Sequence, residues 1–331
     1  MFVRARLARR GDDTGPTRVL VVGAARSGTT WVAEVLARTA GSDYLHEPDS
    51  VDWVPFAARA RAGMGLLPVV RPNRPAPQRY ARLWDAAFSS GRRSVRNRVA
   101  VPMYLSVPRE LRTEASAGAR SPLRARAAVL LSAPRSARPG TRNHIVKSVQ
   151  APLALEWIFE RLSPGVVLVR RHPLAIVASR LQFGKMFLPD RQPPVDERCV
   201  DELVRRWSAP ERPGPGRPFE DLVWLVGFTV SAYDEVAAAH AGFRVVEHEQ
   251  LCASPEERFH DLVTALGLVW TDACDAYLRH SNAEGAGFST NRLASTQSRT
   301  WEGRLTDEQL STARAVLAGF PLATRYPDLV A

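Results

Sequence analysis

The chain has 331 residues, of which 45% are hydrophobic and 24% are charged. This composition is typical of a folded globular protein and excludes wholesale disorder. Three cysteines without a Cys-x-x-Cys pair exclude a disulfide scaffold, argue against a structural zinc site and fit a reducing compartment. Basic residues exceed acidic ones by 11, and all of the basic residues are arginine except Lys147 and Lys185.

The positive charge is concentrated in residues 55–142. This segment holds 18 arginines, three acidic residues and ten prolines, so we expect short helices and irregular connections there. A segment of this kind favours an anionic acceptor or docking on an anionic membrane face. A high arginine content of the whole chain, combined with a solvated surface, explains the charge equally well.

The predicted elements alternate between strands and helices. We expect residues 1–17 to form a short basic arm. Short, mostly apolar runs predict strands at 18–23, 43–46, 144–149, 165–170 and 243–246. Apolar periodicity predicts helices at 29–39, 152–162, 173–183, 219–241, 254–267 and 306–320. The alternation favours an α/β fold in one domain: a three-layer sandwich with a central parallel sheet and helices on both faces.

Local signals support several of these boundaries. Pro173 begins one predicted helix, and capping patterns start at Ser254 and at Thr306. The longest uncharged apolar run, residues 222–233, is too short to span a bilayer and predicts a buried helix. The N-terminal residues lack an apolar h-region, so we expect no secretory signal and a cytoplasmic protein.

A glycine-rich loop joins the first predicted strand to the first predicted helix. The stretch Gly23–Thr30 has the spacing GxxxxGK[ST], but Thr29 replaces the lysine and Arg26 precedes it by three residues. Backbone N–H groups of such a loop, together with a helix N-terminus, bind anions. In an ATPase that lysine contacts the phosphates at which the reaction takes place. Because the lysine is missing here, we expect the loop to bind a 5′-phosphate-type anion in a way that differs from an ATPase. A purely structural glycine turn is the alternative.

Two stretches resemble the signatures of sulfotransferases that use 3′-phosphoadenosine 5′-phosphosulfate (PAPS). RSGTTW (Arg26–Trp31) resembles their 5′-phosphosulfate-binding loop, and VRRHPLAIVASRL (Val169–Leu181) resembles their second signature. In that second signature, Arg171 and Ser179 would hold the 3′-phosphate. The strand–helix segment Val245–Leu268 is similar to a later part of many members.

The resemblance implies a P-loop-NTPase-like fold, a single sulfotransferase domain over residues 1–331, PAPS as co-substrate and no metal. It covers 18–50 and 143–320 and leaves 55–142 as a variable, irregular insertion on the acceptor side. Trp31 is similar to a residue that stacks on adenine in some members, although packing in the core is an equal alternative. The nucleotide would further be held by Arg26, Ser27, Gly28, Thr29, Thr30, Ser298 and Arg299.

Glu47 is the candidate catalytic base. It follows the second predicted strand and therefore emerges at the carboxyl edge of the sheet, where open α/β sheets bind ligands. In the tyrosine and carbohydrate sulfotransferase branch, a glutamate at a similar position acts as base. Burial would raise the pKa of such a carboxyl group toward a useful value. A salt-bridging acid is the alternative role, and His46 is the rival base.

Lys147 and Arg26 are the candidate cations for the charge that develops in the reaction. Lys147 ends a predicted strand and resembles a strand-end lysine of the tyrosine sulfotransferase branch, while a solvated strand end is the alternative. The predicted function is transfer of a sulfuryl group to a hydroxyl or amine of a carbohydrate, a glycolipid or another small molecule, without a nucleic-acid partner. A P-loop nucleoside-triphosphate-dependent kinase or hydrolase and a non-catalytic anion- or nucleic-acid-binding module are the alternatives.

Overall fold

The computed structural model describes residues 17–91, 94–113, 122–183, 197–282 and 301–330. Its centre is a sheet of five parallel strands in the order β2-β3-β1-β4-β5. The strands are β1 (Thr17–Val22), β2 (Ser42–His46), β3 (Asn143–Ser148), β4 (Gly165–Arg170) and β5 (Arg244–Glu247). All five lie within about two residues of the ranges predicted from the sequence.

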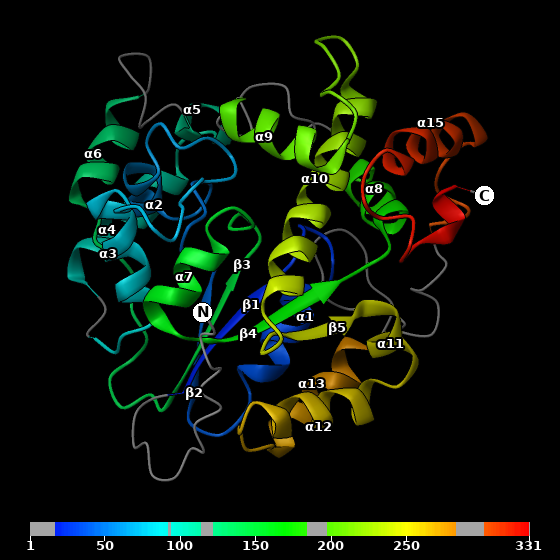
Figure 1. Cartoon of the computed structure of the whole chain (residues 1–331). Helices are drawn as coiled ribbons and strands as arrows, with labels where there is room; N and C mark the ends of the chain where they lie inside the picture. Colours follow the sequence, from blue (N-terminus) through cyan, green and yellow to red (C-terminus); the bar gives the residue numbers. More distant parts are fainter. Residues whose placement is uncertain (1–16, 92–93, 114–121, 184–196, 283–300, 331) are drawn as a thin grey trace, which may run out of the picture.

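Helices cover both faces of the sheet, as predicted (Figure 1). Alternate residues of β1 point to opposite faces: Leu20 and Val22 enter one apolar cluster, and Val19 and Val21 enter another. The first face packs against α2 (Pro55–Ala60), α3 (Gln78–Ala87), α7 (Leu155–Leu162) and the end of α10 (Pro218–Ala239). The second face packs against α1 (Thr29–Leu36), α11 (His248–Ala253), α12 (Pro255–Ala265) and α13 (Asp272–Ser281).

A third apolar cluster lies beside the sheet. It joins α10 to α8 (Pro173–Leu181), α9 (Glu197–Trp207) and α15 (Asp307–Ala318), and the 3₁₀ turn Pro327–Leu329 closes it. α10 is long and apolar enough to cross a membrane by length and composition, but 67% of its apolar window is buried inside the protein, as in a core helix. The cytoplasmic location stays a prediction.

The basic segment 55–142 forms short helices, as expected. After α2 and α3 come α4 (Val95–Leu105), α5 (Arg109–Thr113) and α6 (Leu123–Leu131), which gather on one side of the molecule (Figure 1). α4 and α6 pack on each other around a small cluster of their own that includes Ala100, Tyr104 and Ala128. This segment is therefore folded onto the sheet through α2 and α3.

Two sequence predictions need correction. The helices α9, α11 and α13 were not predicted, because each is short or carries mixed polarity. The capping box expected at Ser254 does not form: the Ser254 side chain makes no cap hydrogen bond, and Pro255 begins the helix instead. The box at Thr306 does form, with Thr306 and Gln309 exchanging side-chain-to-backbone hydrogen bonds. The predicted basic arm lies outside the described residues, apart from Thr17, which begins β1.

Candidate active site

The glycine loop leaves the carboxyl end of β1 and leads into α1, with Gly28 at the N-cap position and a φ of 96°. Its two glycines lie where no side chain fits. A Cβ on Gly23 would lie 2.4 Å from the carbonyl oxygen of Val169 on β4, and one on Gly28 would lie 2.4 Å from Cδ2 of His248. The loop is thus pressed between β4 and α11. Such close backbone approach explains why glycine occupies both positions.

Arg26 connects the two signature stretches. Its Nε donates a hydrogen bond to Oγ of Ser179 at 3.1 Å, and Nη1 of Arg171 donates to the carbonyl oxygen of Arg26 at 2.9 Å. Arg171 precedes α8, and Ser179 lies inside that helix, yet both contact the same loop residue. The two stretches that the sequence analysis singled out therefore lie together around Arg26.

A third arginine, Arg180, lies beneath the same loop and was missed in the sequence. It is buried, and its Nε approaches the carbonyl oxygen of Ala25 at 3.4 Å. Burial, together with the positive charge of Arg26, lowers the pKa of Arg180 to about 10. Positive charge is thus concentrated around Ala25 and Arg26, where a bound anion would relieve the repulsion between the two guanidinium groups.

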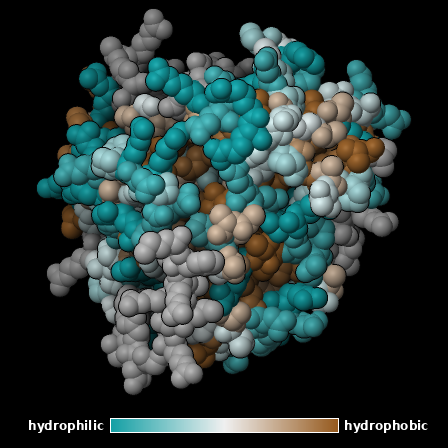
Figure 2. Space-filling model, in the orientation of Figure 1, coloured by the Kyte–Doolittle hydropathy of each residue, from teal (hydrophilic) through white to brown (hydrophobic). Residues whose placement is uncertain are grey.

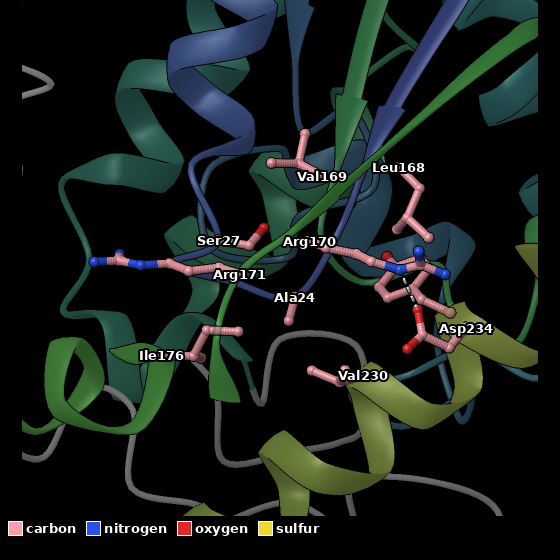
Figure 3. A pocket seen from close by; sticks show the side chains of 10 residues that line it. Ala24, Ser27, Leu168, Val169, Arg170, Arg171, Ile176, Val230 and Asp234 are labelled. Atoms are coloured by element: carbon pink, nitrogen blue, oxygen red, sulfur yellow. Dashed lines mark hydrogen bonds and ion pairs between the residues drawn. The ribbon is translucent and has the colours of Figure 1, made fainter. Parts of the chain in front are cut away.

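A small pocket lies between the loop, the end of β4, the start of α8 and the helix α10 (Figure 3). Ala24, Ser27 and Arg171 line it, and the buried hydroxyl of Ser27 has no hydrogen-bond partner within the described part of the chain. Arg170 turns the opposite way to Arg171 and donates to Oδ1 of Asp234 at 2.6 Å. Of the two consecutive arginines, only Arg171 therefore faces the glycine loop.

Glu47 and Lys147 form an ion pair at the end of β2 and β3. His46 is the register partner of Lys147, and the backbone N–H of Glu47 donates to the carbonyl oxygen of Lys147 at 2.9 Å. The two side chains are buried, with 12% of Glu47 and 4% of Lys147 exposed. Lys147 is thus not a solvated strand end, and Glu47 is salt-bridged.

The pKa of Glu47 is shifted in the direction opposite to the one expected from its burial. Burial alone would raise it, but the Lys147 ammonium, His46 and a hydrogen bond with Trp53 together hold the pKa below its ordinary value. The prediction of a raised pKa is therefore wrong. Glu47 also has a positive φ of 41°, as Arg26 has one of 78°. Such strained backbone in non-glycine residues is concentrated at functional sites.

His46 lies beside this pair but on the more exposed side. Its Nε2 is 3.8 Å from Oε1 of Glu47, and its Nδ1 shares a 2.8 Å hydrogen bond with the hydroxyl of Tyr44. Burial and then the positive charge of Lys147 lower the pKa of His46, which favours the neutral imidazole at pH 7. His46 can therefore accept a proton, and it stays the alternative base to Glu47.

The glycine loop and the ion pair share one edge of the sheet. Lys147 is level with Val21 on β1 and with His46 on β2, so the strands end together. Adjacent strands lie about 5 Å apart, which places the strand that bears Glu47 about 10 Å from the strand that leads into the loop. A bound molecule of modest size can reach both.

A buried polar network behind the ion pair was not predicted. Oγ of Ser148 donates to Oδ2 of Asp49 at 2.6 Å, and Nη1 of Arg61 donates to the carbonyl oxygen of Asp49 at 2.6 Å. Asp49 and Ser148 follow Glu47 and Lys147 in the chain, so the network holds both strand ends. Trp53, a partly exposed neighbour of Glu47, was missed as well. Nothing local in the sequence brings these residues together.

The remaining nucleotide-binding predictions have mixed outcomes. Thr29 and Thr30 begin α1, and Thr29 is buried. The indole of Trp31 packs edge-on against Phe259 and donates to Oγ of Ser281 at 3.0 Å. These contacts favour its packing role, and stacking on adenine stays a prediction. Ser298 and Arg299 lie outside the described residues.

Comparison with known proteins gives distant similarities. No family model and no curated protein matches the sequence. Three solved structures to which the chain is similar are sulfotransferases. STF1 from Mycobacterium tuberculosis H37Rv is 13% identical with a TM-score of 0.38, over 88% of this chain and 78% of its own. STF9 from Mycobacterium avium is 13% identical with a TM-score of 0.40, over 96% of this chain and 77% of its own.

A third similar structure is the sulfotransferase domain of the olefin synthase from Synechococcus PCC 7002. It is 10% identical with a TM-score of 0.35, over 93% of this chain and 97% of its own. Similarities this distant assign no role to any residue here. The function has to be inferred from the site itself.

Proposed function

We propose that this chain is a sulfotransferase that takes a sulfuryl group from PAPS and transfers it to a hydroxyl or amine of a carbohydrate, a lipid or another small molecule. The observation that carries the proposal is the convergence of Arg171 and Ser179 on Arg26. These contacts bridge 145 and 153 residues of sequence and unite the two predicted phosphate sites. A nucleotide with phosphates at both its 5′ and 3′ positions requires two such sites side by side.

The residues around the loop fit an anionic nucleotide. The buried hydroxyl of Ser27 lacks a hydrogen-bond partner among the described residues, and the positive charge of Arg26 adds to burial in lowering the pKa of Arg180. The N-terminus of α1 adds backbone N–H groups that favour negative charge. Gly28, Thr29 and Thr30 would hold the 5′ side. Arg171 and Ser179 would hold the 3′-phosphate.

Glu47 and Lys147 would activate the acceptor. When bound, the phosphosulfate supplies the sulfuryl group. Because its pKa is held low, Glu47 is ionised at neutral pH and can accept the proton of an acceptor hydroxyl at its carboxylate. The low pKa makes it a weaker base than a raised pKa would. Lys147 keeps the carboxylate in place and, together with Arg26, would stabilise negative charge that develops beside it.

Calorimetric titration with 3′,5′-ADP, ADP and ATP, with and without Mg²⁺, tests the proposal. We expect preferential, Mg²⁺-independent binding of 3′,5′-ADP. Arg171→Ala should weaken that binding about 10- to 100-fold, which corresponds to the loss of a hydrogen bond to a charged group. Arg217→Ala is the matched control, because Arg217 is an exposed arginine paired with Glu220. Transfer from labelled PAPS to a panel of acceptors then tests the reaction itself.

The two alternative functions predict other outcomes. Preference for ATP with Mg²⁺ would indicate a kinase or hydrolase. Binding of nucleic acid with a steep salt dependence, and no preference for a 3′-phosphate, would indicate a binding module. Either result would contradict the sulfotransferase proposal.

A further inference from the structure

The helices α4 and α6 present an unusual number of aliphatic side chains to solvent. The described residues contain eleven exposed large hydrophobic side chains. Six of them lie on α4 and α6, and a seventh, Leu111, lies on α5 between them. Single exposed aliphatic residues are normal on proteins, but a local concentration of them marks an interaction site. The seven residues are Val95, Val99, Leu105, Leu111, Leu123, Leu130 and Leu131.

These side chains do not serve the core of the protein. The inner faces of α4 and α6 already pack against each other through a separate buried set that includes Ala100, Tyr104, Ala125 and Val129. On the outer face of α6, Leu123 is 79% exposed and Leu130 is 69% exposed. The two residues are seven positions apart and therefore lie on the same side of the helix. Each helix is thus apolar on its buried face and again on its outer face, unlike an ordinary surface helix.

The same outer surface carries arginines and no acidic residue of its own helices. Arg96 and Arg98 on α4, and Arg124 and Arg126 on α6, are all exposed. In Figure 2 the side of the molecule where Figure 1 places these helices shows hydrophobic and hydrophilic residues next to each other. Cationic and aliphatic side chains therefore share one surface.

A second group of arginines adjoins the C-terminal end of α6. Nη1 of Arg59 donates to the carbonyl oxygen of Leu130 at 3.3 Å. Arg59 lies on α2, which packs against α3, and Arg79 and Arg82 are exposed on α3. Burial, and then the positive charges of Arg79 and Arg82, lower the pKa of Arg59. A cluster of this kind has the charge and the donors that a phosphate anion requires.

We propose that the exposed surface of α4 and α6, together with Arg59, Arg79 and Arg82, docks on an anionic phospholipid bilayer. We call it the insertion surface. Its aliphatic side chains would enter the boundary between headgroups and acyl chains, and its arginines would contact lipid phosphates, as in other interfacial helices. A nucleic acid would use the arginines but would leave leucines such as Leu123 in water. The proposal does not depend on sulfuryl transfer.

Buried residues of α4 and α5, behind the insertion surface, contact the loop that follows Glu47. The hydroxyl of Tyr104 on α4 donates to the carbonyl oxygen of Val51 at 2.7 Å. Nη1 of Arg112 donates to the carbonyl oxygen of Asp52, also at 2.7 Å. These contacts hold the loop that follows Glu47. Docking would therefore place a bilayer on the outer side of the helices that hold this loop.

Co-sedimentation of the 331-residue chain with lipid vesicles tests the proposal. We expect binding to vesicles of phosphatidylcholine mixed with phosphatidylglycerol, loss of binding at high salt, and little binding to phosphatidylcholine alone. Leu123→Ser combined with Leu130→Ser should weaken binding by about tenfold for each leucine that enters the bilayer. Arg96→Gln and Arg124→Gln should each weaken binding about fivefold.

Val269→Ser is the matched control, because Val269 is 63% exposed and lies between α12 and α13. All the altered side chains are exposed, so the melting temperatures of the variants should equal that of the parent, as checked by circular dichroism. The proposal would be overturned by no binding to either vesicle, by equal binding to both, or by unchanged binding of the double leucine variant. Self-association that the leucine variant abolishes, in the absence of lipid binding, would make the surface an interface between copies of the chain and would also overturn it.

Discussion

Oγ of Ser179 accepts a hydrogen bond from Nε of Arg26 at 3.1 Å, although 153 residues separate them in the chain. The contact joins the loop after β1 to the helix after β4, and these strands are neighbours in the sheet. It places Ser179 beside the glycine loop, in the proposed anion site. The first prediction follows from this contact.

Ser179→Ala should weaken binding of 3′,5′-ADP about two- to tenfold, the usual effect of losing one hydrogen bond. Binding of 5′-AMP, which lacks the 3′-phosphate, should change less. Calorimetry on both nucleotides measures the difference, and Ser89→Ala, an exposed serine at the end of α3, is the control. Equal losses for the two nucleotides would show that Ser179 supports the loop without contacting a 3′-phosphate.

Glu47→Gln should lower turnover about 10²- to 10⁴-fold, the usual contribution of a positioned base. Nucleotide affinity should stay close to that of the parent protein, because Glu47 belongs to the acceptor side of the proposed site. Single-turnover transfer from PAPS and calorimetry with 3′,5′-ADP provide the two measurements. Glu202→Gln is the control, since Glu202 is an exposed carboxylate paired with Arg71. Full turnover by Glu47→Gln would move the role of base to His46.

Lys147→Gln should shift the acid limb of the pH–rate profile to higher pH. Burial raises the pKa of Glu47, and the Lys147 ammonium has the largest effect among the groups that lower it. Without the ammonium, the effect of burial is largely uncompensated, and the pKa of Glu47 rises. A base must be ionised to act, so a higher pKa means that activity is lost sooner as pH falls. An acid limb that stays in place would show that Lys147 does not control the ionisation of Glu47.

The same pair predicts how stability depends on pH. In the parent protein the pKa of Glu47 is lower in the folded state than in the unfolded chain. Its contribution to the free energy of unfolding is therefore fully present above the pKa of the unfolded chain, and it is lost as the pH falls through the pKa of the folded state. Lys147→Gln leaves a buried carboxylate without its cation, which should cost about 3–5 kcal/mol at neutral pH. The difference in the free energy of unfolding between the parent and Lys147→Gln should become smaller at acidic pH, because Glu47 is then protonated. Denaturant unfolding at several pH values measures it.

Gly28→Ala should weaken nucleotide binding and lower stability by about 1–3 kcal/mol, the usual effect of overpacking. The added Cβ would meet the buried ring of His248, and φ of Gly28 is 96°, which strains any other residue. Gly242→Ala is the control, because a Cβ there meets nothing within 4 Å. Denaturant unfolding and calorimetry check both variants. A Gly28→Ala variant as stable as the parent would show that α11 does not constrain the loop.

The strands and the main helices could be predicted because their signals are local. The β-branched runs before Gly23 and at β4 stand out in composition, and Pro173 marks the start of α8 where the structure has it. The box at Thr306 was predicted and forms, while the one at Ser254 was predicted and does not. A capping pattern in the sequence indicates that the hydrogen bond can form, but the backbone conformation of the preceding residues decides whether it does form.

The candidate site was predictable only in part. The sequence itself determined the glycine loop, the order of the elements and the residue types at the strand ends, because each depends on neighbours in the chain. Only the tertiary structure decided that Lys147 pairs with Glu47, since that contact requires β3 to lie beside β2. It also decided that Arg180 lies beneath the loop and that the pKa of Glu47 is lowered. A pKa reflects burial and every nearby charge at once, and strand order and burial arise only when distant segments pack together.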